Sequence, residues 1–392
     1  MLFLSQRELQ PLVKELALLF LKLGATAFGG PAAHIAMMEE EIVKRRKWIT
    51  HEHFLDLLGA TNLIPGPNST EMAIHIGYVR AGLRGVLVAG FCFVVPAILI
   101  TLLFAELYVS YGSTPQLSSL IFGIRAAIIA VIAGAVFRLS KPVLKKTNSL
   151  IIGVAVIILN LVGVNEILLL FSAGMVGLLW NSFSIFRSNI SSFIGFIPFL
   201  NQQYNVTSFS TSISTNEATL TGLGLFFLKI GSILYGSGYV LVAFLQSELV
   251  NVRHWLTQSQ LLDAIAVGQF TPGPLSSTAT FIGYIILGLP GAIVATAGMF
   301  LPSFIFVLIS SPFIPKIRKS QLASGFLDGV NAASLGLMFA VTISLATSSL
   351  TSIGAWLIFL LAGIVVVIWN LNAAWIVVGS ALVGWLFSMF TK

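Results

Sequence analysis

The chain of 392 residues is 57% hydrophobic and 9% charged, whereas an average soluble domain is about 25% charged. So much apolar surface cannot be hidden inside a water-soluble fold, and the composition therefore predicts an integral membrane protein. The net charge of +7 comes from cations in short loops between apolar runs rather than from one basic face, which argues against a nucleic-acid partner.

Apolar runs long enough to cross a bilayer recur along the chain, and two-residue alternation is absent. The predicted fold is therefore all-α and polytopic. About ten transmembrane helices are expected, at residues 12–33, 85–108, 118–138, 149–164, 166–186, 220–245, 283–311, 321–346, 353–370 and 372–390.

The first predicted helix carries a lysine and a glycine-rich break. Lys22 lies within an apolar run, where an ammonium group is costly unless it has a partner or a use. It is either an anion-binding charge or a cation whose side chain extends to the membrane surface. Gly29 and Gly30, in "TAFGGP", either unwind the helix or permit close helix packing.

A re-entrant helical hairpin is predicted next, around Pro65-Gly66-Pro67. Its arms, 54–64 and 68–79, would each reach about 18 Å as helix, which is too short to cross. A tight turn in an external loop is the alternative. In the hairpin, the N-terminus of the second arm would face an anion at mid-membrane. The residues predicted to bind there are Asn62, Pro65, Gly66, Pro67, Asn68, Ser69 and Thr70, the last three through N-cap side chains.

Further ionisable groups lie in apolar surroundings. Glu71 and His75 are four residues apart on the second arm, as a proton-carrying pair requires, and a structural Glu–His hydrogen bond is the alternative. Arg125 lies deep in an apolar run, where either a salt bridge or a bidentate contact with an oxyanion is expected. Asp56, Asp263 and His34 are expected at interfacial or packing positions.

The second half of the chain repeats the first. "FLKLGATAFGG" at Phe20 returns as "FLKIGSILYGS" at Phe227, a displacement of 227 − 20 = 207 residues. After one deletion the displacement becomes 206, and Arg125 then corresponds to Asn331. A second re-entrant hairpin follows from this match. The binding residues predicted in the second copy are Lys229, Gly236, Gln269, Pro272, Gly273, Pro274, Ser276 and Ser277.

The loop charges predict that the two copies are oppositely oriented. Cations of the first copy cluster at residues 44–47, 80–84 and 138–146, whereas the loop "SYGSTPQ" has none. The counterpart of that loop in the second copy carries Lys316, Arg318 and Lys319. The positive-inside bias therefore predicts an inverted-topology repeat, as in many secondary transporters. We expect an N-terminal repeat at 1–190, a Ser/Thr/Asn-rich linker at 191–219 and a C-terminal repeat at 220–392.

The segments "FLKLGATAFGGP" and "RRKWITHEHFLDLLGATNLIPGPNST", with their second copies, resemble the chromate ion transporter family of the long-chain, two-domain type. The resemblance covers roughly residues 10–345. It implies chromate efflux and resistance, driven by protons, with sulfate as the structural analogue. It points to binding by Lys22, the Gly29–Gly30 pair and both Pro-Gly-Pro motifs, and the second copy departs from the pattern at Gly236-Ser237.

These patterns predict a secondary active transporter that exports an inorganic oxyanion, chromate or sulfate, across the cytoplasmic (inner) membrane of a cell. The two inverted halves would rock around a mid-membrane anion site, with the lipid bilayer as surroundings. A passive anion channel that uses the same helix tips is the alternative. Nucleotide-binding, metal-binding and protease motifs are missing, so no enzyme activity, cofactor or metal is expected. The architecture allows a homodimer.

Overall fold

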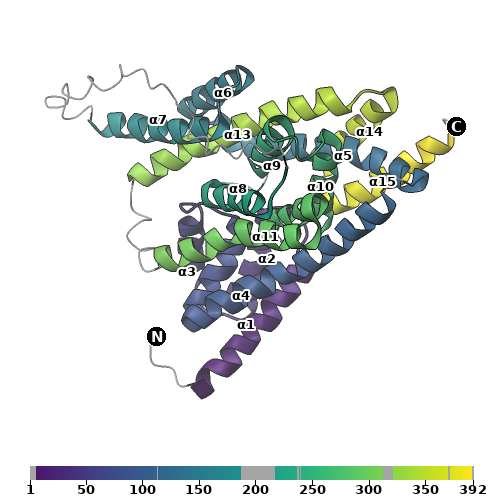
Figure 1. Cartoon of the computed structure of the whole chain (residues 1–392). Coiled ribbons are helices and arrows are strands. Elements are labelled where there is room, and N and C mark those ends of the chain that lie inside the picture. Colours follow the sequence, from purple (N-terminus) through teal and green to yellow (C-terminus); the bar gives the residue numbers. More distant parts are fainter. Residues whose placement is uncertain are drawn as a thin grey trace.

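The computed structural model describes residues 6–112, 114–186, 217–235, 238, 240–311, 321–369 and 371–390. Every regular element in these ranges is a helix, which confirms the all-α, polytopic prediction (Figure 1). The predicted linker at 191–219 lies outside them except for residues 217–219. Gly236 and the second-copy loop that carries Lys316, Arg318 and Lys319 also lie outside the described residues.

The two halves have matching series of elements. Those of the first half are α1 (Gln6–Thr26), α2 (Gly30–Glu39), the π-helix η1 (Glu40–Arg45), α3 (His51–Thr61), α4 (Asn68–Tyr111), α5 (Pro115–Leu144), α6 (Thr147–Leu161) and α7 (Glu166–Phe186). Those of the second half are α8 (Leu220–Ile233), α9 (Val240–Leu245), the π-helix η3 (Gln246–Val252), α10 (Gln258–Phe270), the 3-10 turn η4 (Leu275–Ser277), α11 (Thr278–Ser310), α13 (Gln321–Ser349), α14 (Ile353–Ile364), the π-helix η6 (Val365–Trp369) and α15 (Ala373–Phe390).

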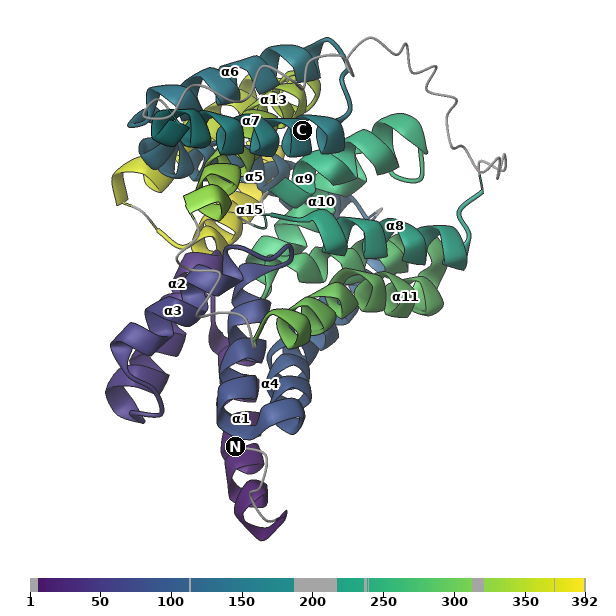
Figure 2. The ribbon, with the colours of Figure 1, turned by 90° about the vertical axis from the view of Figure 1, so that its left-hand side faces the viewer.

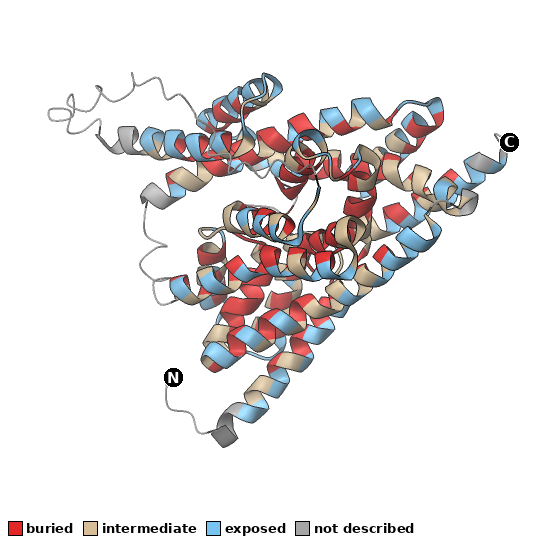
Figure 3. Cartoon of the chain, in the orientation of Figure 1, coloured by how far each residue is buried: buried red, intermediate tan, exposed pale blue. Residues whose placement is uncertain are grey.

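Apolar side chains cover the outside of the helices as well as the inside. On α4, for example, Phe91, Leu99 and Leu103 are each more than half exposed, which suits contact with lipid tails (Figure 3). Among the described residues, four helical segments are long and apolar enough to cross a membrane, at 68–111, 117–141, 275–310 and 324–349. The other apolar helices are shorter, so the predicted count of ten is not established.

Helices α4 and α11 each contain a sharp reversal at matched positions. The backbone leaves helical geometry at Ala81–Gly82 in α4 and at Leu287–Gly288 in α11. After the reversal the chain folds back on itself, and a Cβ atom at Gly77 would overlap the carbonyl of Gly85. Two glycines are needed there because the backbones of the two arms touch. Each of these helices is therefore a short hairpin arm followed by a long helix.

The two halves are interlocked. Helices α6 and α7 of the first half pack along α13 of the second, and α14 and α15 of the second half pack along α5 of the first (Figures 1 and 2). The remaining pairs also match, because α1 packs on α4 as α8 packs on α11, and α4 meets α11 across the centre. The two halves therefore pack together through several pairs of helices.

Candidate functional site

The first hairpin has the geometry expected from its sequence. Helix α3 begins after Thr50, whose hydroxyl accepts a hydrogen bond from the His53 backbone N–H, and it ends at Thr61. Gly66 has φ +145°, a conformation that side-chain-bearing residues avoid, and α4 starts at Asn68. The predicted break and reversal are confirmed.

The second hairpin is built the same way. Thr257 and Gln260 form a capping box at the start of α10, which ends at Phe270. Gly273 has φ +91°, and a 3-10 turn leads into α11. A 3-10 turn rises about 2.0 Å per residue against about 1.5 Å in an α-helix, which helps to absorb the one-residue deletion in the second copy.

The first helix of each half is interrupted rather than merely closely packed. Helix α1 ends at Thr26 and α2 begins at Gly30, with φ +109° at Gly29 and +79° at Gly30. In the second half α8 ends at Ile233, and α9 begins at Val240. We call the segment 27–29 the first break and the described non-helical residues 234–235 the second break.

Each hairpin tip is bonded to the break of the other half. The Gly66 N–H donates to the Leu234 carbonyl at 2.6 Å, and the Gly273 N–H donates to the Ala27 carbonyl at 2.9 Å. Donors and acceptors are each displaced by 207 residues, since 273 − 66 = 234 − 27 = 207. The two bonds are therefore a reciprocal pair that the duplication generates, and they tie the halves together at the centre.

A small pocket lies where the second tip meets the first break. Its volume is about 10 Å³, room for about one water molecule. Helix α2 starts at this pocket with a left-handed N-cap at Gly29, no side-chain cap and a proline, Pro31, in its first turn, so the positive end of the helix dipole lies at the pocket. The lining residues are Gly29, Gly30, Pro31, Gly268, Gln269, Thr271, Gly273 and Leu275.

The structure differs from the predicted site in two respects, namely the residues that line the pocket and the caps of the helices that follow the tips. The expectation was a site between the two tips, but the pocket joins one tip to the opposite break, and Pro65, Gly66 and Pro67 do not line it. The predicted side-chain caps are not formed. Pro67 is the N-cap of α4 and Pro274 is the N-cap of the 3-10 turn η4, whereas Ser277 does occupy the N-cap position of α11 but makes no capping hydrogen bond with its side chain.

The polar residues after each tip have other surroundings than those predicted. The Asn68 side-chain amide donates to Asn62 Oδ1 at 2.8 Å instead of capping its helix. The side chains of Ser69, Thr70, Ser276 and Ser277 are buried, and among the described residues the hydroxyls of Thr70 and Ser277 have no hydrogen-bond partner. Each of these two unpartnered hydroxyls lies three residues after the second proline of its Pro-Gly-Pro motif.

Glu71 and His75 are fully buried on the short arm of α4. Neither Glu71 oxygen has a hydrogen-bond partner of normal geometry among the described residues, although Ser303 of α11 lies beside the same tip glycine, Gly66. The His75 Nδ1 lies 3.2 Å from Ser311 Oγ. No hydrogen bond joins Glu71 to His75 among the described residues, so the alternative of a structural Glu–His hydrogen bond is wrong.

Arg125 forms a buried ion pair between the halves. Its Nε and Nη2 each donate to Asp263 of α10 at 2.7 Å, and the Tyr108 hydroxyl donates to the same carboxylate at 2.7 Å. Of the two alternatives for Arg125, the structure has the salt bridge. Asp263 is only 3% exposed, so its expected interfacial position is wrong.

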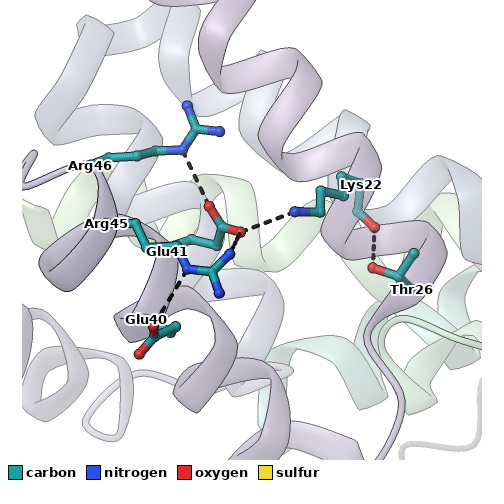
Figure 4. Close-up of polar contacts among 6 residues, drawn as sticks. All are labelled: Lys22, Thr26, Glu40, Glu41, Arg45 and Arg46. Atoms are coloured by element: carbon teal, nitrogen blue, oxygen red, sulfur yellow. Dashed lines mark hydrogen bonds and ion pairs between the residues drawn. The ribbon is translucent and has the colours of Figure 1, made fainter.

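The two lysines predicted to bind the anion lie elsewhere. The Lys22 ammonium is 3.0 Å from Glu41, which also contacts Arg45 and Arg46 (Figure 4). The hydrogen bond from Lys22 lowers the pKa of the Glu41 carboxyl. Lys229 is exposed on α8. Neither lysine lines the pocket.

His34 contacts the first break, a role that the sequence analysis did not predict. Its Nε2 donates to the Ala27 carbonyl at 3.0 Å, and its ring packs edge-on against Phe93. The carbonyl of Ala27 therefore accepts from both His34 and Gly273. The repeat counterpart of His34 is Leu241, so internal matching could not single it out.

A larger chamber of about 540 Å³ adjoins the first break. It shares Gly29 and Pro31 with the pocket, and it extends between α3, α5 and α13. Asn62 and Asn68 line the chamber rather than the pocket, and Arg138 lies at its wall. No cluster of metal-binding side chains occurs in the described part of the chain.

Comparison with known proteins agrees with the duplicated architecture. The family model described as "Chromate transporter" matches twice, at residues 14–178 and 221–385. The chain is 33% identical to the "Chromate transport protein" of Cupriavidus metallidurans, over 95% of this chain and 92% of that one. It is 32% identical to the "Probable chromate transport protein" of Synechococcus elongatus, over 89% and 88% of the two chains. No solved structure matches. The chain belongs to the chromate transporter family, a family of membrane transporters rather than enzymes.

Proposed function

We propose that this protein is a secondary active transporter that exports a tetrahedral oxyanion, chromate or its analogue sulfate, across the cytoplasmic membrane. The observation that carries the proposal is the pocket between the second tip and the first break, where an uncapped helix N-terminus meets Gln269 and the Thr271 segment. Family membership and the names of the relatives support the class of substrate.

The pocket suits an oxyanion because the uncapped N-terminus of α2 lies in its wall, where Gly29 and Gly30 can offer backbone N–H groups, whereas Pro31 has none and the Gly273 N–H is bonded to Ala27. Such groups, with the dipole of α2 behind them, bind a dianion without a cationic side chain. The volume of the pocket, about 10 Å³, is that of roughly one water molecule and is too small for the oxyanion. Substrate binding therefore requires the tip and break to separate, which lengthens the Gly273–Ala27 hydrogen bond. Lys22, Lys229 and Arg125 are not part of this proposed site.

Proton coupling is assigned to Glu71, with His75 as its neighbour. Glu71 lies at the first tip, at the junction that the repeat relates to the oxyanion pocket. A fully buried carboxyl whose polar neighbour is the Ser303 hydroxyl, in an otherwise apolar region, is the kind of group that proton-driven transporters use. One junction would hold the anion and the other the proton.

Alternating access is supported by an asymmetry between the halves. The chamber beside the first break is lined by Asn331, whereas its counterpart Arg125 closes the related position through Asp263 and Tyr108. We infer that the described conformation is open toward the side of the basic loops and closed on the other. Breaking the Arg125–Asp263 pair would open the opposite path.

The test is chromate transport by the purified protein in proteoliposomes, with sulfate, molybdate and phosphate as competitors. The proposal requires saturable transport that an imposed proton gradient drives and a protonophore abolishes. Conductance that does not saturate would favour the passive channel. No movement of any of these anions would refute transport.

A further inference from the structure

The chamber beside the first break has a composition that points to a ligand. Among the described residues that line it, the only charged side chain is Arg138, and none is a carboxylate. Three carboxamides and one hydroxyl supply its other polar groups, from Asn62, Asn68, Asn331 and Ser334. The rest of the wall is apolar. A cavity with one cation, no anion and several donors is polarised for a negatively charged guest.

Two of these polar groups lack a protein partner. The Ser334 hydroxyl is buried, at 4% exposure, and no hydrogen-bond partner for it occurs among the described residues. In the Asn62–Asn68 pair, the Asn68 Nδ2 group donates to Asn62 Oδ1. The other atom of the Asn68 carboxamide, Oδ1, is buried and has no hydrogen-bond partner among the described residues. Oxygen and nitrogen of such a linked pair exchange roles when both amides flip together, so the pair can present an N–H group to the chamber.

We propose that this chamber is a second oxyanion site, in which Arg138, Ser334 and the Asn62–Asn68 pair hold the dianion before it passes Gly29 into the pocket. The inference rests on the proposed transport function and adds residues to it. At about 540 Å³ the chamber holds a tetrahedral dianion together with several waters, given about 30 Å³ per water. The shared Gly29 and Pro31 make it continuous with the wall of the pocket.

The repeat explains why this site belongs to one half only. Arg138 corresponds to Ser344, since 344 − 138 = 206, and Ser344 accepts a hydrogen bond from Gln246 at 2.7 Å. Asn331 corresponds to Arg125, which is engaged by Asp263. The equivalent position in the other half therefore has a serine in place of Arg138. A transporter built this way collects the anion from one side.

The test compares chromate exchange in right-side-out and inverted membrane vesicles that contain the full-length protein. For chromate supplied on the chamber side, Arg138→Gln should raise KM about tenfold with kcat unchanged, because one charge-assisted contact is lost. KM measured from the opposite side should stay within about twofold. Ser334→Ala should shift KM in the same direction on the same side by a smaller factor.

Lys145→Gln is the matched control, because Lys145 is exposed at the end of the same helix and does not line the chamber. Lys145→Gln also removes one positive charge from this end of the helix, and it should change the KM for chromate on neither side of the membrane. Equal effects of Arg138→Gln and Lys145→Gln, or an unchanged KM in both Arg138→Gln and Ser334→Ala, would overturn the chamber site while wild-type transport persists. Absence of wild-type transport would instead overturn the proposed function.

Discussion

The two hairpins share a backbone and differ in their chemistry. Both reverse at a glycine of positive φ, and each donates one tip N–H to the opposite break. The first hairpin carries buried Glu71 and His75 and borders the open chamber. The second carries Thr278 and Phe281 on its outgoing arm and is held by Arg125 through Asp263.

This contrast shows what duplication preserves. The backbone bonds at the tips need only glycine and a carbonyl, so they survive in both copies and keep the pseudo-symmetric frame. Side chains have diverged within that frame, so that one junction holds the titratable Glu71 and the other a pocket with room for about one water molecule. We expect variants at matched positions to have unequal effects, and the following changes test this.

The largest effect is expected from Glu71→Gln. The amide keeps the size of the side chain but cannot release a proton, so proton-driven accumulation of chromate should be abolished while exchange down a chromate gradient continues. The measurement is chromate uptake into inverted vesicles with and without a pH gradient. Glu52→Gln, an exposed change on α3 of the same hairpin, is the control and should leave accumulation intact. Accumulation by Glu71→Gln at the wild-type level would remove Glu71 from coupling.

Asp263→Asn should destabilise the protein by about 3 kcal/mol, because it leaves the Arg125 guanidinium without its carboxylate. Arg125→Lys keeps the charge and loses the bidentate contact, so its cost should be smaller. Thermal unfolding in detergent micelles measures both. The double variant Arg125→Gln with Asp263→Asn should cost less than the sum of the single changes, and strict additivity would contradict a direct pair.

Gly66→Ala should cost about 2–3 kcal/mol and more than Gly273→Ala, because φ is positive at both but the added methyl group collides more severely at Gly66. There it meets the Glu71 carboxylate and Ser303 Oγ, whereas at Gly273 its nearest neighbour is the Ala97 Cβ at 2.9 Å. Gly59→Ala on α3 meets nothing within 4 Å and should be neutral or stabilising. Unfolding midpoints in the reverse order would contradict the described tip packing.

The smallest effects are expected at the matched lysines. Lys22→Gln breaks an ion pair whose lysine side chain is 58% exposed, so a loss of stability below about 1 kcal/mol is expected. Lys229→Gln should lower the stability by no more than Lys22→Gln does. Neither change should alter KM for chromate, which flux measurements will show. A large rise in KM for either would return these charges to the substrate site.

Local features of the fold were predictable from the sequence, and contacts distant in the chain were not. Proline stops a helix and glycine permits positive φ wherever they occur, so the reversals at 65–67 and 272–274 followed from residue type. The glycines of the first helix left unwinding and close packing as alternatives, and only the structure chose between them. The pairing of Arg125 with Asp263 joins residues 138 apart in the chain, and it depends on α5 packing against α10. The docking of each tip on the opposite break likewise needed the interlocked packing of the halves.

The most direct test of the oxyanion pocket is anomalous X-ray scattering from crystals grown with molybdate, a tetrahedral dianion that stands in for chromate. The strongest molybdenum peak is expected at the junction bounded by Gly29, Gly30, Gln269 and Gly273, with the Gly273–Ala27 distance increased. A strongest peak beside Lys22 or Lys229, with none at that junction, would contradict the account.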